Sequence, residues 1–518
     1  MSKSPPSSLI PHPSSLAAWL DRAVVFFLFV FALFAPHSIA ATQGAWLCGM
    51  LLWVARYFVR PRPVLARTPL DYALLGFFIL TFFSTLFSYD RDVSIGKLRA
   101  ASLFTIVYLL AQASASRRVL RMLAVVLVAS CMVNVVYTFG ARALGRGVKV
   151  LELRAESPLY VAGVRAGDTL LKVDDVRVSR PSDIVRALET SSEKADNDDG
   201  RARVQSYRYE LVYTFEAARG ELLEGATPEA RLGIARWSRG RDERATGFYG
   251  QYVTYAEVLQ LVGSLAVGLF IALGRKRSWR GALLAVSIAG LTAALIMTLT
   301  RASWLGFLLS AFTIMLAGAA SRRTLLLTAC VAVPLVVAGL FVLQQKRRVG
   351  FLDRQDASTT WRLDVWREGA QILLREPRHL LVGTGMDSLK GHWREWGMFD
   401  GGRQPWGHLH STPLQLAFER GLPTLLCWLV LVALYARMLW RLVRSRNGDA
   451  ALDWIERGTV LGALGGLVGF LVSGLVHYNF GDSEVVMVFY FMMGLALAIH
   501  LRARDEDARA RDAARSVR

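Results

Sequence analysis

Two arginines and a pair of histidines are the residues of this sequence whose types and spacing could do chemistry. The first arginine, Arg301, lies in the stretch Thr298–Trp304 (Thr-Leu-Thr-Arg-Ala-Ser-Trp), a tight turn between two apolar runs. An unpaired arginine at membrane depth costs about 2.5–3.5 kcal/mol on insertion scales, so it is a functional candidate by default. The alternative is an arginine that merely reaches the membrane interface beside Trp304. We take Arg301 as an anion-binding candidate and Trp304 as possible lining of the same site.

The second arginine, Arg362, lies on a predicted helix that runs from Thr360 to about Leu374. The pair Glu376-Pro377 ends this helix, because a residue before proline disfavours the helical conformation. Arg362 and Trp366 are four residues apart and therefore share one helix face. Arginine keeps its charge, and its planar fork suits the oxygens of a phosphate. We predict that Arg362 binds a phosphate-bearing substrate, with Trp366 as possible lining.

The histidines His408 and His410 stand just before an apolar helix, in the stretch Gly-His-Leu-His-Ser-Thr-Pro. A neutral imidazole there could act as a general base; the alternative is a histidine at a helix start with no chemical role. His-x-His can also be half of a zinc site. No third ligand follows at the usual spacing, although His379, His392 or Asp387 could approach in space. We therefore predict no metal and no cofactor.

A third stretch, His477–Glu484, forms the predicted turn between the last two apolar runs. Tyr478 and Asp482 within it are possible lining of the same site. The alternative is an ordinary loop that carries an interfacial tyrosine.

The elements that position these residues are predicted to be membrane helices. The chain has 518 residues, of which 53% are apolar and only 20% charged, and its mean hydropathy is +0.34. This composition excludes a single soluble core and a disordered chain. About twelve runs are long enough to span a bilayer. Their approximate bounds are 19–36, 40–58, 70–88, 97–114, 119–139, 252–273, 281–299, 303–319, 324–343, 421–440, 458–477 and 484–501.

The charge distribution predicts the orientation of these helices. The chain carries 61 Lys and Arg against 41 Asp and Glu, a net charge of +20. Arginine and lysine gather in the loops after the second, fourth, sixth, eighth and tenth runs, which by the positive-inside rule are cytoplasmic. Both termini are then cytoplasmic, and the charge needs no nucleic-acid partner. The first run is predicted to be a retained helix; a cleaved signal peptide is the alternative.

With this orientation only two large segments face outward, 140–250 and 344–412. The predicted organisation is a disordered cytoplasmic tail, five spans, an outer insert, four spans, an outer catalytic loop, three spans and a second cytoplasmic tail. These parts cover residues 1–18, 19–139, 140–250, 252–343, 344–412, 413–501 and 502–518. The fold class is therefore an all-α polytopic membrane protein with about twelve spans and one small α/β insert.

The insert resembles a bacterial PDZ domain over residues 145–220. The residues that match its Ser-Pro-Ala-x-x-Ala-Gly-Leu-x-x-Gly-Asp-x-Ile-Leu pattern are Ser157, Pro158, Ala162, Gly163, Gly167, Asp168 and Leu171. A PDZ domain adds a peptide strand to a sheet edge, which predicts a periplasmic peptide partner. The glycine-rich carboxylate-binding loop is not evident, since only Gly145 and Gly147 are nearby, so a purely structural insert is the alternative. Residues 193–200 are a predicted loop, and 207–213 a predicted strand.

The remaining features together resemble the O-antigen ligase and O-antigen polymerase superfamily. They are the spans, the Thr-x-x-Arg-x-x-Trp turn, the long outer loop before the tenth span, and a His-Ser-x-x-Leu…Glu-x-Gly-Leu-Pro stretch. The resemblance implies metal-independent transfer of a glycan from undecaprenyl pyrophosphate to an acceptor hydroxyl. It implies that Arg301 and Arg362 hold the diphosphate and that His410 is the base, with His408 as second candidate. Direct attack at the anomeric carbon would invert its configuration.

Several readings stay open at this point. Among enzymes that transfer lipid-linked glycans, the chain could be an O-antigen or exopolysaccharide polymerase, or a protein O-oligosaccharyltransferase. The sequence does not identify the acceptor, which could be a glycolipid, a glycan or a protein. From other classes, it could be a transporter of lipid or glycan, or a PDZ-type membrane scaffold. The favoured prediction is a lipid-linked glycan ligase of the bacterial inner membrane, whose partners are the lipid-linked donor, the acceptor and the bilayer.

Overall fold

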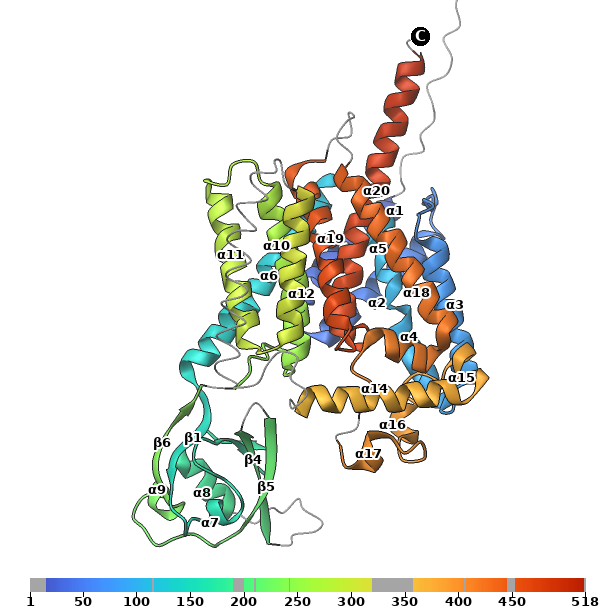
Figure 1. The fold of residues 1–518 in the computed structure, drawn as a ribbon. Coiled ribbons are helices and arrows are strands. Elements are labelled where there is room, and N and C mark those ends of the chain that lie inside the picture. Colours follow the sequence, from blue (N-terminus) through green and yellow to red (C-terminus); the bar gives the residue numbers. More distant parts are fainter. Residues whose placement is uncertain are drawn as a thin grey trace, which may run out of the picture. The chain divides into compact units, whose positions relative to one another are not determined.

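The computed structural model describes residues 15–113, 116–189, 200–208, 211–241, 243–318, 357–404, 407–444 and 452–516. These residues form two compact units (Figure 1). The first, the helical unit, comprises the chain up to Asn134, residues 248–296 and the residues from Thr300 onward. The second, the sheet unit, comprises Val135–Gly247 and Met297–Leu299.

The helical unit is built from long apolar helices. Its helices, including the two 3-10 turns η1 and η2, are α1 (Ser15–Phe34), α2 (Ile39–Arg56), α3 (Asp71–Leu86), α4 (Arg91–Ala101), η1 (Ser102–Phe104), α5 (Thr105–Ala113), α6 (Arg117–Leu144), α10 (Tyr252–Ala272), α11 (Trp279–Met297), α12 (Arg301–Gly318), α14 (Ala357–Arg375), α15 (Pro377–Val382), α16 (Leu389–His392), α17 (Met398–Gly402), α18 (Thr412–Arg444), α19 (Trp454–Gly474), η2 (Asn479–Gly481) and α20 (Ser483–Ser516). Helix α6 starts in this unit and ends in the sheet unit.

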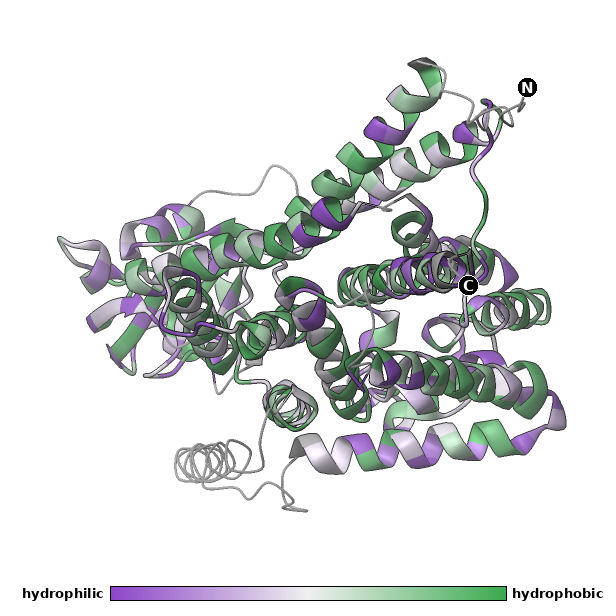
Figure 2. Ribbon diagram, turned by 90° about the horizontal axis from the view of Figure 1, so that it is seen from above, coloured by the Kyte–Doolittle hydropathy of each residue, from purple (hydrophilic) through white to green (hydrophobic). Residues whose placement is uncertain are grey.

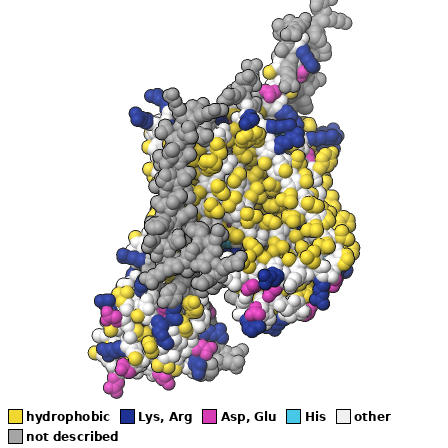
Figure 3. All heavy atoms as spheres, in the orientation of Figure 1, with side chains coloured by type: hydrophobic (Ala, Val, Ile, Leu, Met, Phe, Trp, Pro, Cys, Tyr) yellow, Lys and Arg dark blue, Asp and Glu magenta, His cyan; other side chains and the backbone are white. Residues whose placement is uncertain are grey.

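Nine helical stretches among the described residues are long and apolar enough to cross a membrane, which confirms the predicted polytopic helical class. Figure 3 shows hydrophobic side chains over the visible face of the helical unit, with Lys and Arg gathered at its two ends. The count of about twelve spans stays a prediction. The predicted span 324–343 lies outside the described residues, and 97–114 is α4 and α5 joined by η1, starting at Arg91.

Glycines allow the central helices to pack closely. Among the candidate membrane spans, α10, α19 and α20 are the most completely buried inside the bundle. A Cβ atom at Gly268 of α10 would collide with the backbone of Gly458 and Gly462 on α19. Small residues at such a crossing let two backbones approach, which is how membrane helices gain packing energy without a hydrophobic driving force.

Helix α14 has a different course from the bundle helices. It lies across one end of the bundle in Figure 1, and Figure 2 shows hydrophilic and hydrophobic residues alternating along it. One face packs in a small core with α17, α18 and the segment before α18. This core includes Val365, Ile372, Phe399 and Leu409, all buried.

The sheet unit is a small α/β module, as predicted. It contains β1 (Arg146–Leu153), α7 (Pro158–Val161), β2 (Thr169–Val173), β3 (Val176–Arg177), α8 (Pro181–Glu189), β4 (Arg201–Arg208), β5 (Leu211–Ala218), α9 (Pro228–Arg231) and β6 (Ile234–Gly240). The strands are antiparallel in the order β5-β4-β2-β1-β6, with β3 paired to β2. Valine and leucine side chains of β1, β2 and β4 bury against α7 and α8.

The sequence interpretation of this module needs one correction. Residues 207–213 are not one strand, because Arg208 pairs with Leu211 and the chain reverses between β4 and β5. Strand β6 lies beyond residue 220, where the predicted resemblance to a PDZ domain ends, but within the predicted insert 140–250, and it completes the sheet by pairing with β1. Of the predicted loop 193–200, only Gly200 lies within the described residues.

Candidate functional site

The segment Gly407–Ser411, which we call the histidine loop, leads into α18 and carries both predicted histidines. His410 has a φ of +48°, a left-handed conformation that costs a non-glycine residue about 1–2 kcal/mol. Two hydrogen bonds hold the fully buried Leu409 beside it. Trp366 Nε1 donates to the Leu409 carbonyl at 2.7 Å, and the Leu409 amide donates to Gln415 Oε1 at 2.6 Å. The predicted helix face of α14 therefore reaches the loop through Trp366.

The two histidines touch each other and two aromatic rings. The His410 amide donates to His408 Nδ1 at 3.1 Å, and the centroids of the two imidazoles are 3.9 Å apart. On the His410 side, the Trp361 ring of α14 packs edge-on with a centroid distance of 4.7 Å. On the His408 side, the Tyr478 ring lies 5.7 Å away. Segments far apart in the sequence thus meet around the pair.

Both imidazoles are held in the neutral form. Burial, and then the neighbouring His408 and Arg362, lower the pKa of His410 from its ordinary 6.5 to about 2. Burial, and then His477 and Lys390, lower the pKa of His408 to about 4. The influence of Arg362 on His410 shows that the predicted arginine and the predicted base share one electrostatic neighbourhood. A neutral imidazole has a free lone pair with which to accept a proton.

Arg301 is the first residue of α12 and is half-buried. The turn before it contains Leu299 with a φ of +55°, which reverses the chain between α11 and α12. Trp304 Nε1 donates to the Leu295 carbonyl at 2.8 Å, so this tryptophan closes the turn. Trp304 therefore supports the position of Arg301 through the backbone of α11.

A buried cluster around Glu257 was not predicted from the sequence. Glu257 of α10 is fully buried, and its two carboxylate oxygens accept hydrogen bonds from α12, α19 and the segment after α19. The donors are Ser303 Oγ at 3.0 Å, Ser473 Oγ at 2.7 Å, His477 Nδ1 at 3.0 Å and Asn479 Nδ2 at 3.3 Å. A single acidic residue inside an otherwise apolar run was the sequence signal that could have found this cluster.

The Glu257 cluster is joined to the histidine loop by one threonine. Thr412, the first residue of α18, donates its amide to the His477 carbonyl at 3.1 Å. Its hydroxyl donates to Asn479 Oδ1 at 2.9 Å. Since Ser303 lies two residues after Arg301, these bonds form a continuous connection from the start of α12 to the start of α18.

The two predicted lining residues of the last turn lie in different places. Tyr478 packs against His408 and donates its hydroxyl to Glu419 Oε2 at 3.0 Å. Asp482 instead accepts a hydrogen bond from Thr254 at the start of α10. Burial and the neighbouring Glu484 raise the pKa of Asp482. Tyr478 thus borders the histidine pair, whereas Asp482 is bonded to α10.

The residues considered as further metal ligands are engaged elsewhere. His379 bonds Tyr89 and the Ile372 carbonyl, and His392 bonds Glu395. The Asp387 carboxylate is paired with two lysines. Among the described residues, no three His, Cys, Asp or Glu side chains form a group that could hold a metal ion.

The start of α12, helix α14 and the histidine loop all fall within one segment that is similar to a known family. Residues 286–429 match the O-antigen ligase family model. The predicted resemblance is confirmed. The O-antigen ligase segment contains Arg301, Arg362 and His410, whereas Tyr478 and Asp482 lie beyond its end. Residues 149–195 match the PDZ domain family model, which confirms the PDZ-like insert.

No curated protein matches the chain. With its apolar helices and its O-antigen ligase segment, the chain is a multi-pass membrane protein.

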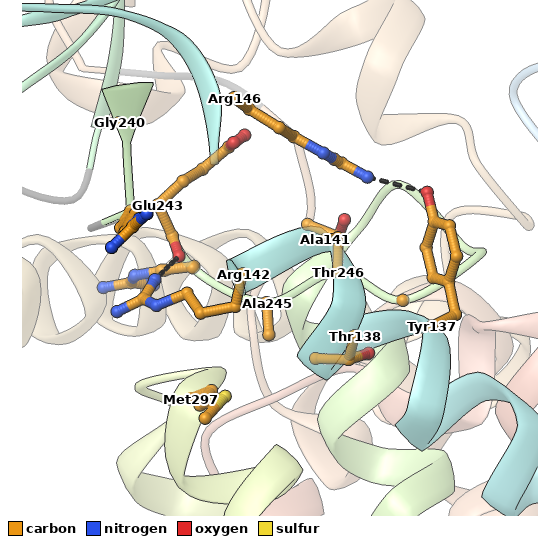
Figure 4. Close-up of a pocket in the computed structure, with 13 residues that line it drawn as sticks. Tyr137, Thr138, Ala141, Arg142, Arg146, Gly240, Glu243, Ala245, Thr246 and Met297 are labelled. Atoms are coloured by element: carbon orange, nitrogen blue, oxygen red, sulfur yellow. Dashed lines mark hydrogen bonds between the residues drawn. The ribbon is translucent and has the colours of Figure 1, made fainter. Parts of the chain in front are cut away.

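The sheet unit contains a basic pocket that was also not predicted (Figure 4). Its lining includes Arg142, Arg146, Arg241, Arg244 and Glu243, of which Figure 4 labels Arg142, Arg146 and Glu243. Arg142 donates to the Glu243 carbonyl at 2.7 Å, and Arg146 donates to the Tyr137 hydroxyl at 2.7 Å. Burial raises the pKa of the Glu243 carboxyl, although the arginines oppose this shift. The excess of arginine makes the pocket positive.

Proposed function

We propose that this protein is a membrane glycosyltransferase that moves a glycan from undecaprenyl pyrophosphate to an acceptor hydroxyl, without a metal and with inversion. The observation that carries the proposal is the half-buried His410, which packs against His408 and Trp361 and lies in the electrostatic field of Arg362, inside a segment that matches the O-antigen ligase family. The proposed site is the outer, periplasmic face of a bacterial inner membrane, with both termini in the cytoplasm.

In the proposed reaction, the acceptor oxygen attacks the anomeric carbon of the lipid-linked sugar. The new glycosidic C–O bond forms as the bond from the anomeric carbon to the diphosphate oxygen breaks. The hydroxyl proton passes to the imidazole of His410, and the electron pair of the broken bond leaves with the diphosphate. Arg301 and Arg362 stabilise the negative charge that develops there. The diphosphate is an activated leaving group, so this step requires no further acid.

The low pKa of His410 suits a base that is switched on by the donor. A pKa of about 2 makes the empty site a weak base, since proton transfer is most effective when the pKa lies near the working pH. Burial is the largest cause of this low pKa, and a diphosphate bound to Arg362 would offset the part that comes from that arginine. The imidazole would then become more basic only when a donor is present.

The acceptor defines the remaining alternatives. A lipid-linked glycan as acceptor would make the protein a polymerase, and a Ser or Thr side chain would make it a protein oligosaccharyltransferase. Strands β5 and β6 are the two edges of the PDZ-like sheet, and an extended peptide can bind by adding a strand to such an edge. This favours a protein partner or a protein acceptor. A transporter or a scaffold would leave the half-buried histidine pair without a role.

The experiment that tests the proposal uses the purified full chain in lipid nanodiscs, with an undecaprenyl-pyrophosphate glycan and a panel of glycolipid, glycan and protein acceptors. The proposal expects a glycosylated acceptor and released undecaprenyl pyrophosphate, and NMR of the product expects an inverted anomeric configuration. Arg301→Ala and Arg362→Ala should each raise the KM for the donor. Absence of product with every acceptor, or a retained configuration, contradicts it.

A further inference from the structure

A cavity lies beside the histidine pair, between α3, α4, α18, α20 and the segment before α20. It holds about 570 Å³ of space that no atom fills, part of which is open to the exterior. Its polar lining is Lys97, Asp387, Glu419, Arg420 and Tyr478. The rest of the lining is apolar apart from Ser483.

Arg420 is the unusual member of this lining. Its side chain is buried, with 7% of the residue exposed, and the guanidinium lies 5.4 Å from the ring centroid of Phe77. Its Nε and Nη1 atoms have no hydrogen-bond partner among the described residues. A guanidinium cannot shed its proton, and a buried charge without a partner is costly. The arrangement is therefore one that an anionic ligand would complete.

The two carboxylates of the cavity do not fill this role. Glu419 accepts from Gln415 Nε2 at 3.0 Å, from the Asp387 amide at 3.0 Å and from the Tyr478 hydroxyl at 3.0 Å. Asp387 pairs with Lys97 at 2.9 Å and with Lys390 at 3.0 Å, which lowers its pKa against the effect of burial. Counting Lys390, which pairs with Asp387, three cations accompany two carboxylates, so this group of residues carries one positive charge in excess.

The cavity is connected to the histidine pair through the same residues. Tyr478 lines it and packs against His408, and Gln415 joins Glu419 to the amide of Leu409. The contacts therefore run in one order, from Trp361 beside Arg362, through His410 and His408, to Tyr478 and the cavity. A ligand group bound at Arg420 would lie on the His408 side of the pair, away from Trp361.

We propose that this cavity binds one singly charged phosphoryl group of a substrate, with Arg420 as its main ligand and Lys97 as a second. The inference rests on the proposed transfer for the identity of the substrates, but not for the existence of the site. The phosphoryl group is either part of the donor's diphosphate or a phosphate substituent on the acceptor. It fixes that substrate on the His408 side of the base.

The site itself is tested by binding, without any transfer reaction. Dimethyl phosphate, a singly charged phosphodiester, is titrated against the detergent-solubilised full chain and followed by the broadening of its ³¹P signal. The chain carries Arg301→Gln and Arg362→Gln, so that the proposed diphosphate ligands do not contribute. Adding Arg420→Gln should weaken binding about 10- to 100-fold, the effect of losing hydrogen bonds to a charged group. Adding Lys97→Gln should weaken it less, because Lys97 is shared with Asp387.

Arg437, exposed on the same helix, provides the matched control: Arg437→Gln should bind dimethyl phosphate like its parent. Arg420→Lys, which keeps the charge but loses the fork, should recover part of the binding and guards against a folding defect in Arg420→Gln. Equal binding by the parent and Arg420→Gln overturns the site, whether or not glycan transfer is detected. Loss of binding together with loss of folded protein in both Arg420 variants, with Lys97→Gln unchanged, also overturns it.

The source of the phosphoryl group is decided by steady-state kinetics of Arg420→Gln in an otherwise unchanged chain. A rise in the KM for the donor alone places the donor's diphosphate in the cavity, and a rise in the KM for the acceptor alone places an acceptor phosphate there. A fall in kcat with both KM values unchanged contradicts a binding role for Arg420.

Discussion

The hydrogen bond from Trp366 to the Leu409 carbonyl should set the catalytic rate, although neither group is proposed to touch a substrate. In Trp366→Phe the ring packing on α14 is largely kept, but the buried Leu409 carbonyl loses its donor at 2.7 Å. An unsatisfied buried acceptor costs about 1–3 kcal/mol. That is as large as the roughly 1–2 kcal/mol that the left-handed conformation of His410 costs.

The expected outcome is that the loop relaxes and His410 leaves its place beside Trp361. If the lost hydrogen bond raises the free energy of the transition state by about 1–2 kcal/mol, kcat falls about 5- to 30-fold. The KM for the donor should change little, because Arg362 is not moved by the substitution. The assay is transfer of a fluorescent glycan by the purified chain in nanodiscs, with thermal unfolding measured in parallel.

Trp361 offers a matched control on the same helix. Its Nε1 atom has no hydrogen-bond partner among the described residues, so Trp361→Phe removes ring area but no hydrogen bond. Trp366→Phe should therefore lower kcat clearly more than Trp361→Phe. Equal kcat values for the two variants, or a Trp366→Phe enzyme that turns over like the parent, would refute the claim that this bond positions the histidine loop.

The other predictions concern protonation and the buried polar groups. Because the pKa values of His408 and His410 are lowered to about 4 and about 2, the acid limb of the pH profile of kcat/KM, which reports the free enzyme, should lie well below pH 6.5. The unfolded chain binds these protons first, so thermal stability should fall as the pH drops below about 6.5. Glu257→Gln places an amide among the four donors of that carboxylate and should lower the free energy of unfolding by about 1–3 kcal/mol, measurable by thermal unfolding in detergent. Asp168→Asn leaves the facing Arg208 without its charged partner and should destabilise the sheet unit by about 3–5 kcal/mol; hydrogen exchange of β2 and β4 measures this, and unchanged protection contradicts it.

The parts of the site that were predictable are local in sequence. Arg362 and Trp366 could be placed on one face because an i, i+4 spacing fixes their relation on any helix. His408 and His410 are two residues apart before a helix start, so their proximity needed no knowledge of the fold. Likewise the turn at Gly167-Asp168 and strand β2 follow from a short pattern of turn residues and apolar alternation.

The parts that were missed depend on contacts between distant segments. Glu257 and its partner His477 are 220 residues apart, and no periodicity links them. Arg420 stands in the Glu-Arg-Gly-Leu-Pro stretch that was used for recognition, but its burial against Phe77 follows from how α18 packs on α3. The reversal between Tyr207 and Tyr213 was missed because β-branched and aromatic residues favour strand on both sides of it.

The central claim is that the imidazole of His410 takes the proton of the acceptor hydroxyl. The measurement that tests it most directly is single-turnover glycan transfer by His410→Ala in nanodiscs, with donor and acceptor saturating. His392→Ala, which removes the histidine at the end of α16, is the control. Removing a general base predicts a rate about 10²- to 10⁴-fold lower than that of the parent, with donor binding retained and His392→Ala close to the parent. A His410→Ala protein that transfers glycan at the parent rate contradicts the account.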